Sequence, residues 1–261
     1  MNKAKIGTWI TTYNPSALDV ISKCNFDWIC VDMEHSSITL EQLENLLNVL
    51  DKNGSNSFVR VSENNKTEIK KVLDLGAKGI IVPMINTPLE AKNAVSYATY
   101  PPKGQRGYAL SRAQGFGYDL INYEKVSKNI KIVVQIESIK AINNLEEILK
   151  VKGIHSTLIG PRDLSGSIGK PGNYKNDKFV KALQKYEKIS KINKVPTGMH
   201  VAYPDTEALN KFIKRGYKFL AIGTDMTFLG DTIRDKLRKI KKWEFMDLFL
   251  QEWDQNDFQA N

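Results

Sequence analysis

The chain has 261 residues, of which 41% are apolar and 26% are charged, so it is not an intrinsically disordered protein and has room for one large domain or two small ones. Its two cysteines, Cys24 and Cys30, exclude a disulfide framework and a cysteine-built zinc site. The net charge of +9 comes from lysines spread along the chain, so we expect no nucleic-acid partner and no membrane partner. No long apolar run or apolar signal core is visible, and we expect a cytoplasmic location.

Short apolar, β-branched segments alternate with amphipathic segments along the chain. The segments predicted to be strands are 6–10, 26–31, 57–61, 79–83, 130–136, 156–160, 197–201 and 218–222. The segments predicted to be helices are 15–23, 40–50, 66–75, 88–97, 142–150, 179–191 and 205–215. Pro15 and Pro88 stand where helices begin, and Gly76 and Gly216 follow helices, as is typical of helix ends.

This alternation predicts a parallel sheet of the α/β class. Eight strand–helix units in about 240 residues is the count of a (β/α)8 TIM barrel. A doubly wound open sheet is the alternative, but the segment 11–14 (Thr-Thr-Tyr-Asn) follows the first strand where that fold usually has a glycine-rich turn. We therefore predict a barrel domain over residues 1–240 and a C-terminal extension over residues 241–261.

Ionisable residues follow the predicted strands at the end where barrel enzymes carry out their chemistry. These residues are Asp32, Glu34, His35, Arg60, Gln135, Glu137, Arg162, Asp163, His200 and Asp225. His155 precedes the sixth predicted strand, so we expect it at the opposite end of the barrel. A barrel built for stability alone does not need so many polar groups on one rim.

Glu137 and Asp163 follow neighbouring strands, and two carboxylates suit a hard divalent cation such as Mg²⁺ or Mn²⁺. The structural alternative is that Asp163 caps a short helical turn and Glu137 pairs with a lysine. Arg60 lies in an apolar strand and needs an anion there, either a protein carboxylate or a substrate. For Asp225, which opens the last helix, the alternative to a site role is a helix cap.

His35 follows Asp32 and Glu34, and an acid beside an imidazole keeps it basic, as a general base requires. The alternative is a histidine that pairs with a loop carbonyl. A metal, an arginine and a base together can form and stabilise an enolate from a 2-oxo acid, which indicates aldol chemistry. A Schiff-base aldolase needs a shielded lysine inside the barrel, whereas Lys78 and Lys131 stand at strand starts.

The sequence resembles the HpcH/HpaI family of metal-dependent (class II) pyruvate aldolases from about residue 6 to residue 229. The segments that carry the resemblance include Val-Asp-Met-Glu-His at 31–35, Tyr-Pro-Pro-Lys-Gly-Gln-Arg-Gly at 100–107, Val-Gln-Ile-Glu at 134–137 and Ile-Gly-Pro-Arg-Asp at 159–163. The resemblance implies a carbon–carbon lyase that reversibly cleaves a 4-hydroxy-2-oxo acid, derived from a sugar, to pyruvate and an aldehyde. It also implies homo-oligomers, often hexamers built from dimers that exchange the last helix.

The resemblance further implies a role for each site residue. Glu137 and Asp163 match the ligands of Mg²⁺, Mn²⁺ or Co²⁺, and His35 matches the catalytic base that an acid at position 32 positions. The other matching residues are Arg60, which stabilises the enolate; Gln135, close to pyruvate and the metal; and Gly160, Pro161, Arg162 and Asp163, whose main chain holds the pyruvate carboxylate. The strand end Gly-Met-His at 198–200 is less apolar than the family pattern, which leaves the aldehyde open.

Two other functions remain as alternatives. One is an acyl-CoA lyase of the citrate-lyase type, but those barrels tend to be longer. The other is a non-catalytic barrel that binds an anionic sugar, but the intact catalytic set disfavours it. The segment 100–122 is rich in Gly, Pro and Tyr and has no clear period, so we predict a functional loop. Its Arg106 and Arg112 suggest an anionic or polyhydroxylated aldehyde.

Overall fold

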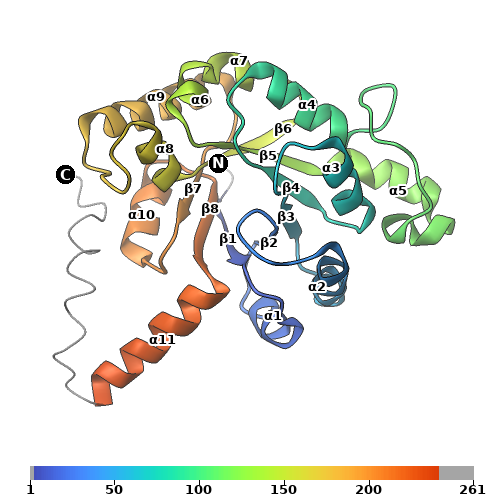
Figure 1. Ribbon diagram of the computed structural model, residues 1–261, viewed down its shortest axis with the longest axis horizontal. Helices are drawn as coiled ribbons and strands as arrows, with labels where there is room; N and C mark the ends of the chain where they lie inside the picture. Colours follow the sequence, from blue (N-terminus) through green and yellow to red (C-terminus); the bar gives the residue numbers. More distant parts are fainter. Residues whose placement is uncertain (1–2, 241–261) are drawn as a thin grey trace.

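The protein forms a closed barrel of eight parallel strands, seen in a computed structural model that describes residues 3–240. Each strand pairs with the next along the chain, and β8 closes the barrel on β1 (Figure 1). The strands are β1 (Lys5–Ile10), β2 (Trp28–Asp32), β3 (Ser57–Arg60), β4 (Gly79–Val82), β5 (Lys131–Ile136), β6 (Ile154–Ile159), β7 (Gly198–Val201) and β8 (Phe219–Thr224). The predicted (β/α)8 barrel is therefore confirmed.

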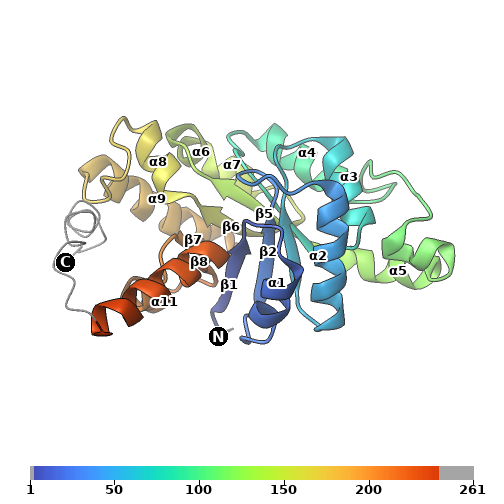
Figure 2. The same cartoon turned by 60° about the horizontal axis from the view of Figure 1, so that its bottom comes forward.

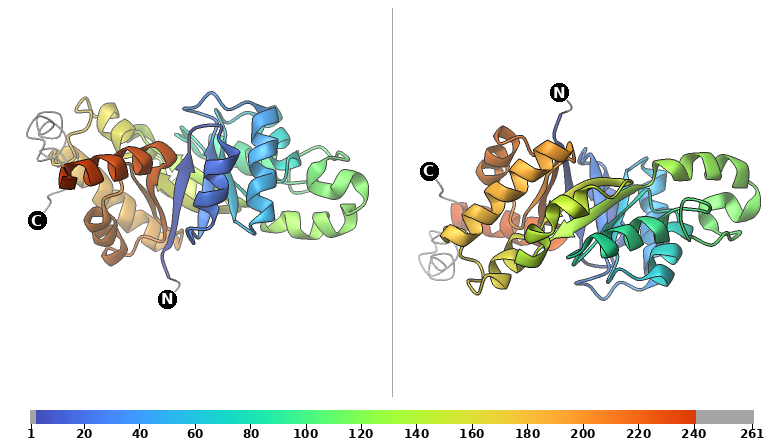
Figure 3. Two further views of the ribbon diagram at one scale, coloured as in Figure 1. Left: turned by 90° about the horizontal axis from the view of Figure 1, so that it is seen from below. Right: turned by 90° about the horizontal axis from the view of Figure 1, so that it is seen from above.

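Helices connect the strands and surround the barrel (Figure 3). They are α1 (Pro15–Ser22), α2 (Leu40–Lys52), α3 (Lys66–Asp74), α4 (Pro88–Ala98), the 3₁₀ helix η1 (Arg112–Gly117), α5 (Leu120–Val126), η2 (Ser127–Asn129), α6 (Ile139–Asn143), α7 (Leu145–Leu149), α8 (Pro161–Ser167), α9 (Asp177–Asn193), α10 (Thr206–Lys214) and α11 (Asp225–Ile240). Local chemistry fixes many of their starts: Thr87 forms a capping box with Glu90, and Pro88 takes the first helical position.

The structure corrects three details of the predicted elements. The helix expected over 142–150 is two helices, α6 and α7, which are separated at Asn144. The first of them already begins after the Ser138 cap. His155 is the second residue of β6 and does not precede the strand, although it does lie near the N-terminal end as expected. The segment 100–122 holds η1 and the start of α5.

Large aromatic rings fill the N-terminal half of the barrel interior. Trp28 stacks on Phe219 with ring centroids 4.3 Å apart, and Phe58 packs against both rings. Glycine is required opposite them, because a Cβ on Gly7 would lie 2.0 Å from the Trp28 indole and one on Gly79 would lie 2.4 Å from Phe58. The barrel is thus a packed core at this end, and its chemistry is confined to the other end.

The last helix, α11, extends away from the barrel (Figure 2), and none of its residues is buried. Asp225 at its start does more than cap the helix: its carboxylate accepts hydrogen bonds from the main-chain N–H and the hydroxyl of both Thr11 and Thr12, at 2.6 to 3.0 Å. These bonds tie the last strand to the first. The predicted C-terminal extension, 241–261, lies outside the described residues, so the domain boundary stays a prediction. Within residues 3–240 no helix is long and apolar enough to cross a membrane.

Candidate active site

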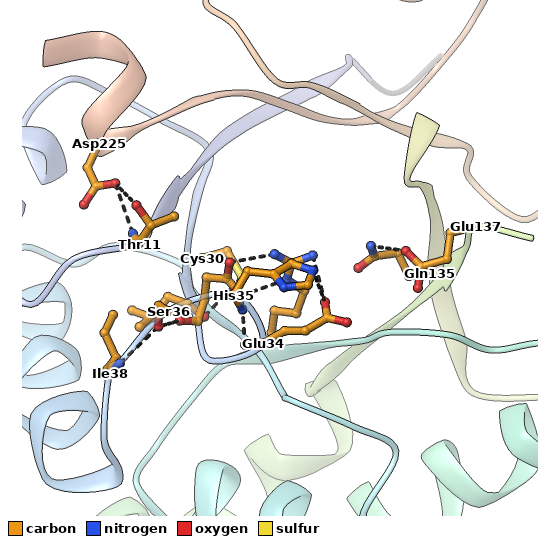
Figure 4. Close-up of polar contacts among 12 residues, drawn as sticks. Thr11, Cys30, Glu34, His35, Ser36, Ile38, Gln135, Glu137 and Asp225 are labelled. Atoms are coloured by element: carbon orange, nitrogen blue, oxygen red, sulfur yellow. Dashed lines mark hydrogen bonds and ion pairs between the residues drawn. The ribbon is translucent and has the colours of Figure 1, made fainter. Parts of the chain in front are cut away.

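The structure brings the predicted site residues together at the C-terminal ends of the strands. Asp32 ends β2 and lies in register with Arg60, which ends β3. Gln135 and Glu137 stand at the end of β5, across the barrel from Glu34 and His35 (Figure 4). Three non-adjacent parts of the sequence therefore converge on one rim, where the fold places chemistry.

Arg60 is held by carboxylates in this structure. Its Nε and Nη2 donate to the two oxygens of Asp32 at 2.8 and 2.6 Å, and its Nη1 lies 2.9 Å from Glu34 Oε2. The guanidinium also covers the face of Trp9, with Cζ 4.6 Å from the ring centroid. The sequence left two kinds of anion as partners of Arg60, a protein carboxylate or a substrate. Protein carboxylates pair with it in this structure, and a substrate oxyanion can replace Glu34.

The His35 side chain is 68% exposed, and its Nε2 lies 3.7 Å from Glu34 Oε2. We expected the Asp32 carboxylate beside the imidazole. Instead, Asp32 accepts hydrogen bonds from the main-chain N–H groups of Glu34 and His35 at 3.0 and 3.3 Å, as well as from Arg60. Asp32 therefore fixes the backbone that carries His35, and Glu34 is the acid nearest to its ring.

Glu137 is buried and accepts two hydrogen bonds. The main-chain N–H of Met84 donates to Oε1, and the side-chain amide of Gln135 donates to Oε2, both at 2.6 Å. Burial raises the pKa of Glu137 to about 6, the bond from Met84 opposes this shift, and the charges of Glu34 and Asp163 add to it. The predicted alternative, a lysine partner for Glu137, is wrong.

Asp163 lies in the first turn of α8, while Gly160 occupies the cap position, so the alternative of Asp163 as a helix cap is also wrong. A Cβ on Gly160 would lie 2.8 Å from Glu137 Oε2 and 3.3 Å from Asp163 Oδ2. The two carboxylates therefore converge on a point that only glycine leaves open. Burial and the charges of Asp32 and Asp163 also raise the pKa of Glu34, although Arg60 opposes the shift.

The donor set fits a hard divalent cation. Two convergent carboxylates, a third nearby, and the buried, unpaired Oε1 of Gln135 are oxygen donors that need a positive charge or water. No group of three or more His, Cys, Asp or Glu side chains within residues 3–240 is arranged to hold a metal ion. Glu137 and Asp163 would thus supply two ligands, and substrate and water the others, as is common for Mg²⁺.

Sequence reasoning gave little weight to two residues at this site. Glu34 lies between Asp32 and His35 in the sequence. The alternation of side chains along a strand does not predict that the Glu34 carboxylate pairs with Arg60. The sequence assigns His200 no catalytic role, yet its ring packs against that of Trp9. Arg162 is exposed beside Asp163, and its Nη1 lies 3.2 Å from the place that a Cβ on Gly172 would take. Pro161 is buried at the first position of α8.

Arg106 and Arg112, which suggested an anionic or polyhydroxylated aldehyde, do not reach the site of their own chain, and the nature of the aldehyde stays a prediction. The Arg106 side chain is fully buried and pairs with Asp74 at 2.7 Å. Arg112 pairs with Asp51 at 2.6 Å and donates to the carbonyl of Leu75. These partners lie at the C-terminal ends of α2 and α3, which in this fold is the end of the barrel opposite the site.

A barrel with carboxylates, an arginine and a histidine at its C-terminal rim has the groups that a divalent-metal-dependent aldolase requires. The HpcH/HpaI aldolase/citrate lyase family model matches residues 5–231, and the chain belongs to this family. The prediction of a class II pyruvate aldolase is confirmed at this level.

Individual relatives agree with this assignment. A 2-dehydro-3,6-dideoxy-6-sulfogluconate aldolase of Pseudomonas putida is 31% identical over 239 residues, covering 91% of this chain and 93% of the relative. A 2-keto-3-deoxy-L-rhamnonate aldolase of Escherichia coli is 31% identical over 241 residues, covering 92% and 90%. An HpcH/HpaI aldolase/citrate lyase family protein of Burkholderia cenocepacia has a similar structure, with a TM-score of 0.87, 26% identity and coverage of 91% and 95%.

Proposed function

We propose that the protein reversibly cleaves a sugar-derived 4-hydroxy-2-oxo acid to pyruvate and an aldehyde, with a divalent cation held by Glu137 and Asp163. The observation that carries this proposal is the convergence of these two carboxylates on Gly160, with Glu34, the partner of Arg60, close enough to raise the pKa of Glu137. The names of the two curated relatives support a sugar-derived substrate, because both act on deoxy sugar acids with an oxo group.

The roles of the side chains follow from their positions. A bound cation would polarise the carbonyl of the 2-oxo acid, which favours enolate formation. Arg60 exchanges Glu34 for the developing oxyanion, while Asp32 keeps the guanidinium in place. His35, exposed at the rim, takes the proton from the substrate hydroxyl as the carbon–carbon bond breaks. Gln135 hydrogen-bonds the bound 2-oxo acid.

The main-chain N–H groups of Arg162 and Asp163 lie in the first turn of α8, and the N-terminal end of a helix favours an anion, so we assign them to the pyruvate carboxylate. Gly160 and Pro161 shape this turn.

The protein works as a homo-oligomer, a hexamer or trimer of dimers, and α11 is the surface that a second copy covers. Its side chains Met226, Leu229, Ile233 and Leu237 are about half exposed at helical spacing. The cytoplasmic location stays a prediction.

The test measures pyruvate release from a panel of 2-keto-3-deoxy sugar acids, with lactate dehydrogenase as the coupling enzyme. Release should require Mg²⁺, Mn²⁺ or Co²⁺ and stop on adding a chelator. Release that continues at full rate after metal removal would contradict the metal-dependent route. Light scattering of the native protein and of Ile233→Glu tests the oligomer, which the substitution should dissociate.

A further inference from the structure

His200 belongs to a group of three side chains that the proposed mechanism uses only in part. It stands in β7, and its ring centroid lies 5.4 Å from that of Trp9 at the end of β1, with the planes inclined by 54°. The Arg60 guanidinium covers the same indole at 4.6 Å. His200 is therefore one side chain away from the guanidinium that is proposed to stabilise the enolate.

Two nitrogen atoms in this group are buried and lack a hydrogen-bond partner among residues 3–240: Trp9 Nε1 and His200 Nε2. A buried polar atom without a partner is costly, so native proteins retain one mainly where water, a ligand or a functional constraint explains it. The indole nitrogen can only donate, whereas an imidazole nitrogen of the neutral ring can donate or accept. A hydroxyl group both donates and accepts, so it can satisfy either nitrogen.

The charge state of His200 agrees with such a role. Burial lowers the pKa of His200 to about 4; the nearby Arg60 charge also lowers it, and Asp32 opposes the shift. At neutral pH the ring is therefore uncharged, and it serves as a hydrogen-bonding group. General base work falls to the exposed His35.

We propose that His200 is a specificity-determining residue, whose Nε2 hydrogen-bonds a hydroxyl group on the aldehyde part of the substrate, with Trp9 Nε1 as a second donor. The substrate class that this site takes is an α-hydroxy aldehyde, in preference to an unsubstituted alkyl aldehyde. The nitrogen is shielded in this structure, and Arg60, which exchanges partners in the proposed mechanism, covers the same indole that His200 contacts. This inference rests on the proposed function.

A site built around a hydroxyl discriminates strongly against the analogue that lacks it, because the polar atoms of the site stay unpaired. The experiment measures aldol addition of pyruvate to lactaldehyde and to propionaldehyde, two three-carbon aldehydes that differ by one hydroxyl. For His200→Leu we expect kcat/KM for lactaldehyde to fall about tenfold to a hundredfold. Propionaldehyde should change by less than about twofold, since it makes no such bond.

Two further variants separate a hydrogen-bonding role from a structural one. His200→Gln keeps a polar group near Nε2 and should retain most of the preference for lactaldehyde. His155→Leu makes the same change near the other end of the barrel and should leave both aldehydes unaffected. An equal loss for both aldehydes in His200→Leu, or an unchanged ratio, would overturn the inference.

Hydrogen–deuterium exchange at the pyruvate methyl group, which needs no aldehyde, separates the inference from the proposed function. Metal-dependent exchange that is equal in wild type and His200→Leu, together with the altered aldehyde ratio, supports both. Exchange with an unaltered ratio overturns the inference alone. Absence of exchange in the wild type overturns the proposed function, and the inference with it.

Discussion

Two regions of the molecule each hold a largely buried arginine that pairs with an aspartate and covers an aromatic ring, at nearly the same distances. At the barrel rim Arg60 approaches Asp32 to 2.6 Å and covers Trp9 at 4.6 Å. In the segment 100–122 Arg106 approaches Asp74 to 2.7 Å and covers Tyr100 at 4.6 Å. The pair itself therefore does not identify an active site.

The surroundings of the two arginines make the difference. Arg60 stands among a surplus of acids, since the charge of Asp163 helps to raise the pKa of both Glu34 and Glu137. Arg106 is surrounded by Asp74 and tyrosine rings, and it holds a segment against α3. The comparison teaches that a catalytic region is marked by carboxylates that the protein leaves uncompensated, which a cation and substrate then balance.

The largest effect should come from removing a carboxylate of the surplus. Glu137→Gln takes away a proposed metal ligand, so we expect kcat/KM for pyruvate formation to fall about a thousandfold or more. The melting temperature of the metal-free protein should not fall, because the change relieves repulsion among acids. Glu147→Gln on the exposed face of α7 is the matched control and should change neither quantity. A Glu137→Gln enzyme that keeps its metal-dependent rate would break the comparison.

The second effect concerns the structural arginine. Arg106→Leu leaves Asp74 without its partner, and we expect the free energy of unfolding to fall by about 3 kcal/mol. The ratio of kcat/KM for an anionic over a neutral aldehyde should stay unchanged, which denaturant titration and kinetics would check together. Adding Asp74→Leu should recover part of the lost stability. A changed aldehyde ratio would instead return Arg106 to the substrate site.

A conservative change at the rim should cost activity. Arg60→Lys keeps the charge but loses the two-pronged contact with Asp32, so the cation no longer holds a fixed place beside the oxyanion. We expect kcat to fall about a hundredfold with a smaller change in KM, measured with pyruvate and the preferred aldehyde. If the role of Arg60 is purely structural, Arg60→Lys will have lower stability and a normal kcat, which would contradict this prediction.

The smallest effect is a pH dependence of stability. His200 has a folded pKa of about 4, below that of the unfolded chain, so the unfolded state binds the proton first. Its stabilising contribution is complete above about pH 6.5 and is lost as the pH falls toward 4, by up to about 1 kcal/mol per pH unit. Both His200→Gln and His200→Leu should flatten this slope in urea titrations between pH 4 and 7. An unchanged slope would show that a group other than His200 causes the pH dependence of stability.

Much of the fold could be predicted because strand and helix periods are local properties. Each strand ends within two residues of the predicted position. The break at Asn144 and the early start of α6 depend on contacts with the loop after β4, such as the bond from Asn144 to the Asn86 carbonyl, and no local pattern encodes them.

The site was partly predictable for the same reason. Strand order alone places Arg60, Glu137 and Asp163 on one rim. Pairing within the rim was not predictable, because whether Asp32 faces the His35 ring or its backbone depends on how the chain turns after β2. The burial of Arg106 likewise follows from packing against α3 and from Tyr123, which the spacing of residues in the segment does not show.

The most direct test of the central claim is deuterium incorporation at the methyl group of pyruvate. Mn²⁺-loaded wild-type enzyme reacts with pyruvate in deuterated water, excess chelator stops the reaction, and proton NMR then measures the incorporation. The proposed site predicts exchange that requires the metal, stops with chelator added at the start, and disappears in Glu137→Gln. Exchange that persists without metal, or its absence when metal is bound, would contradict the assignment of Glu137 and Asp163 to enolate formation.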